Sequence, residues 1–132
     1  ANILEDYDIS IEVIDLRSLR PLDKETIIES IKKTKRLIVV DNGWVNYGIS
    51  AEILSIATEN LFEQMESKPI RIGINDSPSP SSRALANHYY PRAKDIAKNI
   101  INILEIDLDI ESIFPEVTTE LDIPDKTFTG PF

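Results

Sequence analysis

The order of apolar segments along this chain constrains its fold more than any other sequence feature. Short apolar runs typical of buried strands alternate with longer segments in which apolar residues recur every three or four positions, as in helices. Strands separated by helices in this way pair in parallel through crossover connections. We therefore predict an α/β fold with three layers, α/β/α, and a mainly parallel sheet. The predicted strands are 9–16, 37–40 and 70–74, and the predicted helices are 24–34, a helix of about 16 residues after Gly48, and 93–104.

The last part of the chain differs in charge from the rest. Residues 105–132 hold eight acidic residues and one basic residue, Lys126, so they carry seven of the nine net negative charges. Residues 1–104 are nearly balanced, with 15 acidic and 13 basic residues. We predict a boundary near Glu105 between a globular domain and an acidic C-terminal extension. Within the extension, alternating apolar residues at 106–113 indicate either a paired strand or an extended arm that lies on the domain.

Composition argues against several classes of protein. The net charge of -9 is unsuited to binding nucleic acid, because neutralising phosphates requires clustered lysine and arginine. No apolar run approaches the roughly 18 residues that a membrane span needs, so no membrane association is expected. The chain has no cysteine, which excludes disulfides, thiolate metal sites and a cysteine nucleophile, and favours an intracellular location.

The sequence offers few candidates for chemistry. His88, the only histidine, lies beside two tyrosines and a proline without the context of a catalytic base, so we interpret it as a structural loop residue. Asp41 and Asp76 follow predicted strands and could share a metal ion, but acid pairs of this kind are common in acidic α/β proteins. The segment Gly43–Gly48 lacks the lysine and the glycine spacing of a phosphate-binding loop. No catalytic, cofactor-binding or metal-binding residue is assigned.

A less common feature is the segment 41–48, which places Trp44 and Tyr47 in a short loop between a predicted strand and a predicted helix. Large aromatic side chains with polar tips are enriched at protein interfaces, so one interpretation is a subunit contact. The other interpretation is that Trp44 covers the core of its own domain. The residues alone leave both open.

Three segments of the sequence together resemble one known family. Residues 13–23 resemble the strand-turn-helix signature of the transketolase carboxy-terminal domain. Residues 41–52 resemble the aromatic loop and helix start of 2-oxo acid dehydrogenase E1 β subunits, which usually carry an acid where Asn42 stands. Residues 76–91 resemble the closing segment of the same subunits. The order and spacing of the segments agree, and the resemblance covers roughly residues 3–104.

The resemblance implies the C-terminal assembly domain of an E1 β subunit of the pyruvate, branched-chain or acetoin type. It implies that thiamine diphosphate and Mg²⁺ bind outside this chain. The chain would then support oxidative decarboxylation of a 2-oxo acid through subunit contacts, and it would not be catalytically competent alone. The implied partners are the remainder of the β subunit, the E1 α subunit, a second β subunit in an α2β2 heterotetramer, and the acyltransferase E2 core. The implied location is the bacterial cytoplasm or the mitochondrial matrix. The implied interface residues are Trp44, Tyr47, Gly48, Glu52 and Tyr90.

By the same resemblance, residues 1–104 form an N-terminally truncated domain that lacks a strand between the predicted strands 9–16 and 37–40. A gap in a sheet leaves unpaired amides and carbonyls, each costing about 1–3 kcal/mol when buried, so we expect the chain to be unstable alone. The extension at 105–132 is expected to fold onto its own subunit, or else to reach a basic peripheral-subunit-binding module.

Two alternative functions remain at this stage. One is the C-terminal domain of a split transketolase or deoxyxylulose-phosphate synthase, and the other is a non-catalytic α/β protein-interaction module. The sequence upstream of the chain would discriminate between them, because a pyrimidine-binding domain with an activating glutamate favours an enzyme.

Overall fold

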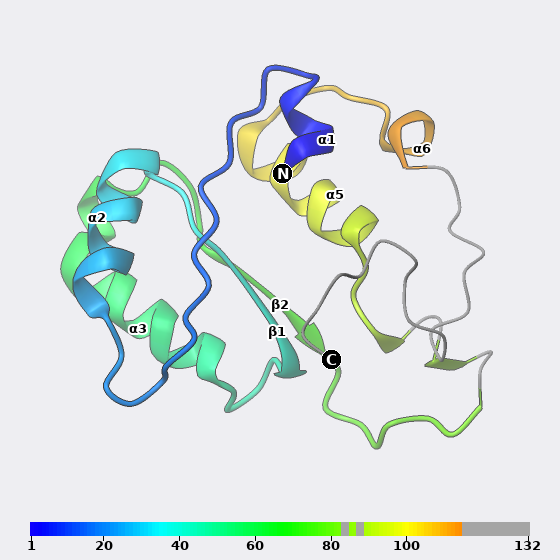
Figure 1. Ribbon diagram of the computed structural model, residues 1–132, viewed down its shortest axis with the longest axis horizontal. Helices are drawn as coiled ribbons and strands as arrows, with labels where there is room; N and C mark the ends of the chain where they lie inside the picture. The colour runs from blue at the N-terminus through cyan, green and yellow to red at the C-terminus, as the bar shows by residue number, and fades with distance from the viewer. Residues whose placement is uncertain (83–84, 87–88, 115–132) are drawn as a thin grey trace.

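The computed structural model describes residues 1–82, 85–86 and 89–114, so His88 and the extension beyond residue 114 lie outside the described part. Figure 1 shows the arrangement of the elements in space. In chain order they are α1 (Asn2–Glu5), α2 (Lys24–Thr34), β1 (Ile38–Trp44), α3 (Ile49–Leu61), the 3₁₀ turn η1 (Phe62–Gln64), β2 (Ile70–Ile74), α5 (Ala93–Leu104) and α6 (Ile110–Ile113).

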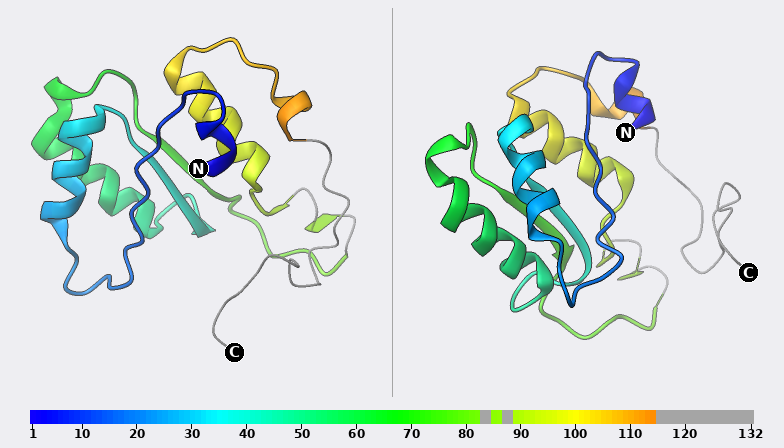
Figure 2. Two further views of the ribbon diagram at one scale, coloured as in Figure 1. Left: turned by 45° about the horizontal axis from the view of Figure 1, so that its top comes forward. Right: turned by 60° about the vertical axis from the view of Figure 1, so that its left-hand side comes forward.

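The centre of the fold is the parallel pair formed by β1 and β2. Val40 aligns with Ile72 and Trp44 with Ile74, and the register shifts between these two positions. The helices α2 and α3 lie on one side of the pair and α5 lies on the other, as the views in Figure 2 show. The α/β class, the parallel sheet and the helical layers predicted from the sequence are thereby confirmed.

The predicted strand at 9–16 is wrong. These residues run as an irregular extended segment from α1 to the loop before α2, and within the described part of the chain the sheet holds only β1 and β2. Apolar residues at both ends of the segment still contribute to the cores. Ile9 is buried against α5, and Leu16 packs against the core beside α2. A strand forms only through a ladder with a neighbour, and a sequence pattern cannot supply that neighbour. Val13 is consequently 72% exposed.

Two further segments differ from their predicted structure. The sequence Asp41-Asn42-Gly43 was expected to end a strand at residue 40, but β1 continues to Trp44 because the register shift absorbs these residues. In the acidic extension, residues 110–113 form one helical turn in place of a paired strand, and Asp109 begins the turn by accepting a hydrogen bond from the Glu111 amide. The helices at 24–34 and 93–104 and the strand at 70–74 are confirmed. The helix after Gly48 has 13 residues, Ile49–Leu61, where about 16 were predicted, and the 3₁₀ turn η1 follows it.

The buried apolar side chains form two clusters on opposite sides of the sheet. The first lies between α2, α3 and β1, and the second joins α1 and α6 to α5. The first comprises Ile27, Ile31, Val39, Ile53, Ala57 and Leu61, and the second comprises Leu4, Ile9, Ala97, Ile101 and Ile110.

The start of α2 yields a prediction about acid stability. The Asp23 carboxylate accepts hydrogen bonds from the Thr26 hydroxyl at 2.7 Å and the Thr26 amide at 3.1 Å, and these bonds lower the pKa of Asp23. Because the pKa is lower in the folded state, the stabilisation is present at neutral pH and is lost as the pH falls below about 4.

We expect Asp23→Ala to lower the free energy of unfolding at neutral pH and Asp23→Asn, which keeps an acceptor oxygen, to lower it less. Denaturant titrations of the assembled protein carrying either variant, at pH 7 and at acidic pH, measure the effect. Both differences from the unmodified chain should shrink in acid, and differences that stay constant with pH would contradict this account.

Candidate subunit interface

The loop that joins β1 to α3 is fixed to β2 at its base. The Val45 amide donates to the Ile74 carbonyl at 3.1 Å, and the Arg71 guanidinium donates to the Val45 carbonyl at 2.8 Å. Trp44 and Ile74 are register partners in the sheet. The backbone on the N-terminal side of the loop is therefore held by both the main chain and a side chain of β2.

The other end of the loop is closed by Gly48, which is the N-cap residue of α3. A Cβ atom at this position would overlap the backbone carbonyl oxygen of Trp44, so the chain passes too close to itself for any other residue. The Gly48 carbonyl accepts from the Ala51 amide at 3.0 Å and starts the helix. The Asp41 carboxylate, which accepts from the Gly43 amide at 3.0 Å, supports the strand end nearby.

Between these fixed ends the loop exposes its aromatic residues. Tyr47 has a φ of 60°, in the left-handed region that bulky residues rarely adopt. Its side chain is 100% exposed, and that of Trp44 is 52% exposed. The described part of the chain therefore holds the loop backbone in place while leaving the Tyr47 ring without cover.

The remaining predicted interface residues lie in two places. Glu52 is exposed in the first turn of α3, one helical turn after Gly48. Tyr90 packs edge-to-face on Tyr89, with ring centroids 5.0 Å apart, and the Tyr89 hydroxyl donates to the Ser77 carbonyl at 2.6 Å. The structure thus gathers the first four predicted residues in one loop-and-helix unit, whereas Tyr90 belongs to the segment that follows β2.

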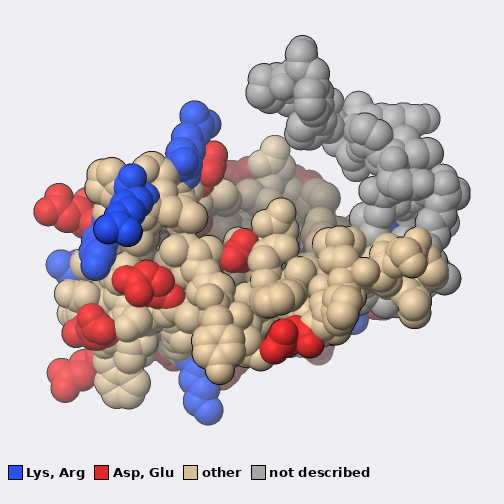
Figure 3. Space-filling model, turned by 90° about the horizontal axis from the view of Figure 1, so that it is seen from below, with Lys and Arg blue, Asp and Glu red and all other residues tan. Residues whose placement is uncertain are grey.

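Figure 3 shows the face of the molecule that lies below the sheet in Figure 1, where β1 leads into α3. On this face the visible lysine and arginine side chains stand mostly on the side of α2 and α3. The middle of the face is mainly uncharged, with isolated acidic side chains. Charged residues are depleted in the centre of protein interfaces, so a mainly uncharged surface is suited to binding another protein.

The two aspartates considered as ligands of a metal ion, Asp41 and Asp76, do not form a metal-binding group in the structure. Asp41 is occupied by the Gly43 amide, and Asp76 is exposed in the loop after β2. Over residues 1–82, 85–86 and 89–114, no group of three or more histidine, aspartate or glutamate side chains is placed to hold a metal ion. A shallow pocket of about 250 Å³ after β2 is lined by Asn75, Ser77, Pro78, Pro80, Leu85 and Tyr89.

Arg71 and Tyr89, which hold the segments around the aromatic loop and after β2, were not predicted from the sequence. Arg71 is the one charged residue of an otherwise apolar strand, and this contrast is the signal that could have marked it. Tyr89 bonds to a carbonyl 12 positions away, and no sequence pattern indicates that contact. Among the described helices, none is long and apolar enough to cross a membrane.

Comparison with known proteins identifies the family to which the chain belongs. The family described as the transketolase C-terminal domain matches residues 1–96, and the chain belongs to that family. Among curated proteins it is 42% identical over 98 residues to the mitochondrial pyruvate dehydrogenase E1 component subunit beta of Pisum sativum, covering 74% of this chain and 27% of the relative. The same subunit of Rickettsia felis is 38% identical over 100 residues, covering 76% of this chain and 31% of the relative. The chain thus spans about three tenths of the length of these relatives.

Proposed function

We propose that the chain is the C-terminal assembly domain of a 2-oxo acid dehydrogenase E1 β subunit, and that it supports oxidative decarboxylation through subunit contacts. The observation that carries the proposal is the loop at 44–48, whose backbone is fixed at both ends while Tyr47 is fully exposed. The relatives, which are pyruvate dehydrogenase E1 β subunits of a bacterium and of plant mitochondria, favour this function over a transketolase acting on sugar phosphates.

A fixed aromatic loop is suited to binding another protein. Aromatic side chains bury a large area on association, and they dominate the energy of many interfaces. A loop that is already held in its bound shape loses little conformational entropy when a partner docks. The partners in this proposal are the remainder of the β subunit, the E1 α subunit, a second β subunit in an α2β2 assembly, and the acyltransferase core, in the bacterial cytoplasm or the mitochondrial matrix.

The same proposal assigns the cofactors to other parts of the enzyme. Thiamine diphosphate with Mg²⁺ would supply the decarboxylation chemistry of the whole enzyme. The described residues gather no set of carboxylates or histidines suited to Mg²⁺, and Asp41 is engaged by a backbone amide. In our proposal, residues of this chain position subunits.

The second part of the proposal is that another polypeptide completes the sheet. Val40 on β1 is 49% exposed, and the segment at 9–16 runs past the sheet without joining the ladder between β1 and β2. A strand contributed by the remainder of the β subunit would pair with the free edge of β1 and cover Val40 and Val13. The unpaired edge and the exposed valines support this arrangement.

Reconstitution tests the proposed function. The chain is produced together with the preceding part of a pyruvate dehydrogenase E1 β subunit and with an E1 α subunit. We expect a stable assembly that decarboxylates a 2-oxo acid only when this chain is present. If the assembly and its activity were the same with and without the chain, the proposed function would be wrong.

A further inference from the structure

Asn42 is the only asparagine in the sequence that a glycine follows. It lies on β1 where the register with β2 shifts. The aligned pairs on either side of the shift enclose Asp41, Asn42 and Gly43 of β1 but only Gly73 of β2, so this part of β1 forms a bulge. The residue at the middle of the bulge, Asn42, is exposed to solvent.

The bulge brings the neighbours of Asn42 close to β2 and leaves the Asn42 side chain free. A Cβ atom at Gly73 would lie 2.8 Å from the Gly43 carbonyl oxygen and 3.3 Å from the Asp41 carbonyl oxygen. The Gly43 amide donates to the Asp41 carboxylate at 3.0 Å, a bond that lies within the bulge. Within residues 1–82, 85–86 and 89–114, no hydrogen bond holds the Asn42 carboxamide. The carboxamide can therefore turn toward the Gly43 nitrogen without breaking a hydrogen bond of its own.

An exposed asparagine followed by glycine can react with its own backbone in water. The Gly43 nitrogen forms a bond to Cγ of Asn42, and its proton is transferred to the side-chain nitrogen, which leaves as ammonia when its bond to Cγ breaks. Water then opens the resulting cyclic imide. Opening at Cγ gives aspartate, and opening at the main-chain carbonyl carbon gives isoaspartate. The reaction consumes one water and releases one ammonia, and glycine favours it because no Cβ atom crowds the attacking nitrogen.

We propose that Asn42 is a site of spontaneous conversion to aspartate and isoaspartate in the folded protein. Either product adds a negative charge to the strand that leads into the aromatic loop at 44–48. Isoaspartate also lengthens the main chain by one atom between Val40 and Trp44, whose alignment with β2 fixes the base of the loop. The conversion itself is independent of the proposed function, whereas an effect on subunit contacts rests on it.

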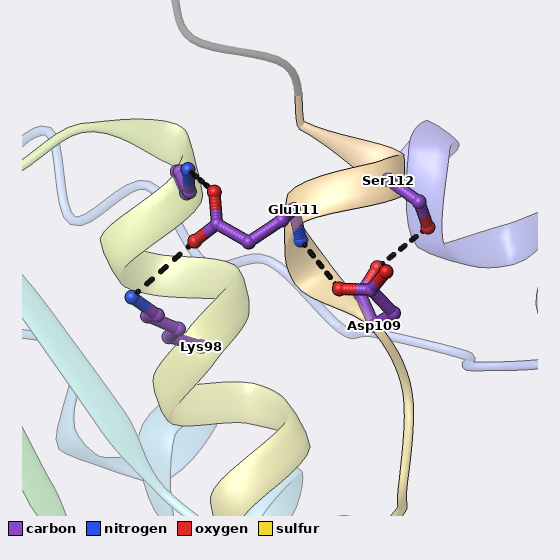
Figure 4. Close-up of polar contacts among 5 residues, drawn as sticks. Lys98, Asp109, Glu111 and Ser112 are labelled. Atoms are coloured by element: carbon purple, nitrogen blue, oxygen red, sulfur yellow. Dashed lines mark hydrogen bonds and ion pairs between the residues drawn. The ribbon is translucent and has the colours of Figure 1, made fainter.

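The same chain contains asparagines that serve as internal controls. Asn46 is exposed in the same loop but precedes a tyrosine. Asn99 donates from its side-chain nitrogen to the Asp95 carbonyl at 2.8 Å on α5. Figure 4 shows the adjacent Lys98 of this helix paired with Glu111, at 3.8 Å. Asn46 thus represents exposure without a following glycine, and Asn99 represents an asparagine held in a helix.

The test uses the assembled protein, which is incubated at mildly alkaline pH and digested for mass analysis of its peptides. Conversion raises the mass of a peptide, and chromatography separates the aspartyl form from the isoaspartyl form. We expect conversion of Asn42 to be at least about tenfold faster than that of Asn46 or Asn99 and at least about tenfold slower in Gly43→Ala. Because the site is exposed, the rate at Asn42 should lie within about tenfold of the rate in the urea-denatured chain. A rate no faster than at Asn46, or one slower than this relative to the denatured chain, would overturn the proposal.

A substitution that supplies the charge of the product separates the conversion from its effect on subunit contacts. We expect Asn42→Asp to raise the dissociation constant of the assembly severalfold, because charged residues are unfavourable in the centre of an interface, and Asn42→Gln to leave it unchanged. If Tyr47→Ser weakened association and Asn42→Asp did not, the effect on subunit contacts would be refuted while the proposed function stood. If neither variant weakened association, the proposed function would itself be refuted, and the peptide masses would still decide whether Asn42 converts.

Discussion

Purified by itself, the chain is expected to give no cooperative thermal transition as a monomer. The reason is the small size of the sheet, because β1 and β2 are the only strands that pair within the described residues. An isolated pair of strands is marginally stable, and its outer edges are templates for association. Circular dichroism during heating, combined with sedimentation at the same concentration, makes the measurement.

Exposed apolar residues are the reason for expecting the isolated chain to lack a sharp monomeric transition. Val40 and Trp44 on β1 and Val13 in the segment at 9–16 leave large fractions of their surface in solvent. Burial of such surface stabilises by about 25 cal/mol per Å², and an isolated chain forgoes this contribution. A polypeptide that pairs a further strand with the edge of β1 should replace a broad thermal transition, or the transition of an oligomer, with a sharp one. A sharp transition of the monomer alone would refute the incomplete-sheet account.

Replacing Gly48 by alanine is expected to destabilise the assembled protein by about 1–3 kcal/mol, the usual cost of forcing extra atoms into a packed site. The φ of Gly48 is -81°, which alanine adopts easily, so the effect arises from overlap with the Trp44 carbonyl and not from the backbone angle. The altered loop should also displace Tyr47 and weaken subunit contacts. Chemical denaturation of the assembly measures the first effect, and its dissociation on dilution measures the second.

Gly43→Ala is the matched control in the same segment. A Cβ atom at Gly43 would lie 3.1 Å from the Asp41 side chain, which can move aside, so we expect a loss of only about 0.5 kcal/mol. If the two variants lost the same stability, close approach of the chain at Gly48 would not be what shapes the loop.

The parts of the fold that follow from local sequence were predictable. The helix 24–34 has a capping aspartate and a helical spacing of isoleucines, and the strand at 70–74 is a short apolar run after a proline. The segment at 9–16 has an equally good strand pattern, but pairing depends on a neighbour that is not part of its own sequence. The turn at 110–113 was missed because the alternation of apolar and acidic residues at 106–111 suits a strand, while packing against α5 favours a helix.

The candidate site was predictable to a similar extent. Trp44 and Tyr47 stood out as aromatic residues in a short loop, and the structure places both at the surface. Their exposure could not be derived from the sequence, because it depends on Arg71 and on the close approach at Gly48. The role of Tyr90 in an interface stays a prediction.

The most direct test of the account is the effect of Tyr47→Ser on subunit association, measured by sedimentation of the assembly over a range of concentrations. Phe62→Ser is the control, because Phe62 is also an exposed aromatic residue, 72% exposed, but follows the opposite end of α3. We predict that Tyr47→Ser weakens association by about 2 kcal/mol, a roughly 30-fold rise in the dissociation constant, and that Phe62→Ser leaves it unchanged. Equal dissociation constants for the unmodified chain and Tyr47→Ser would contradict the assignment of the aromatic loop to subunit assembly.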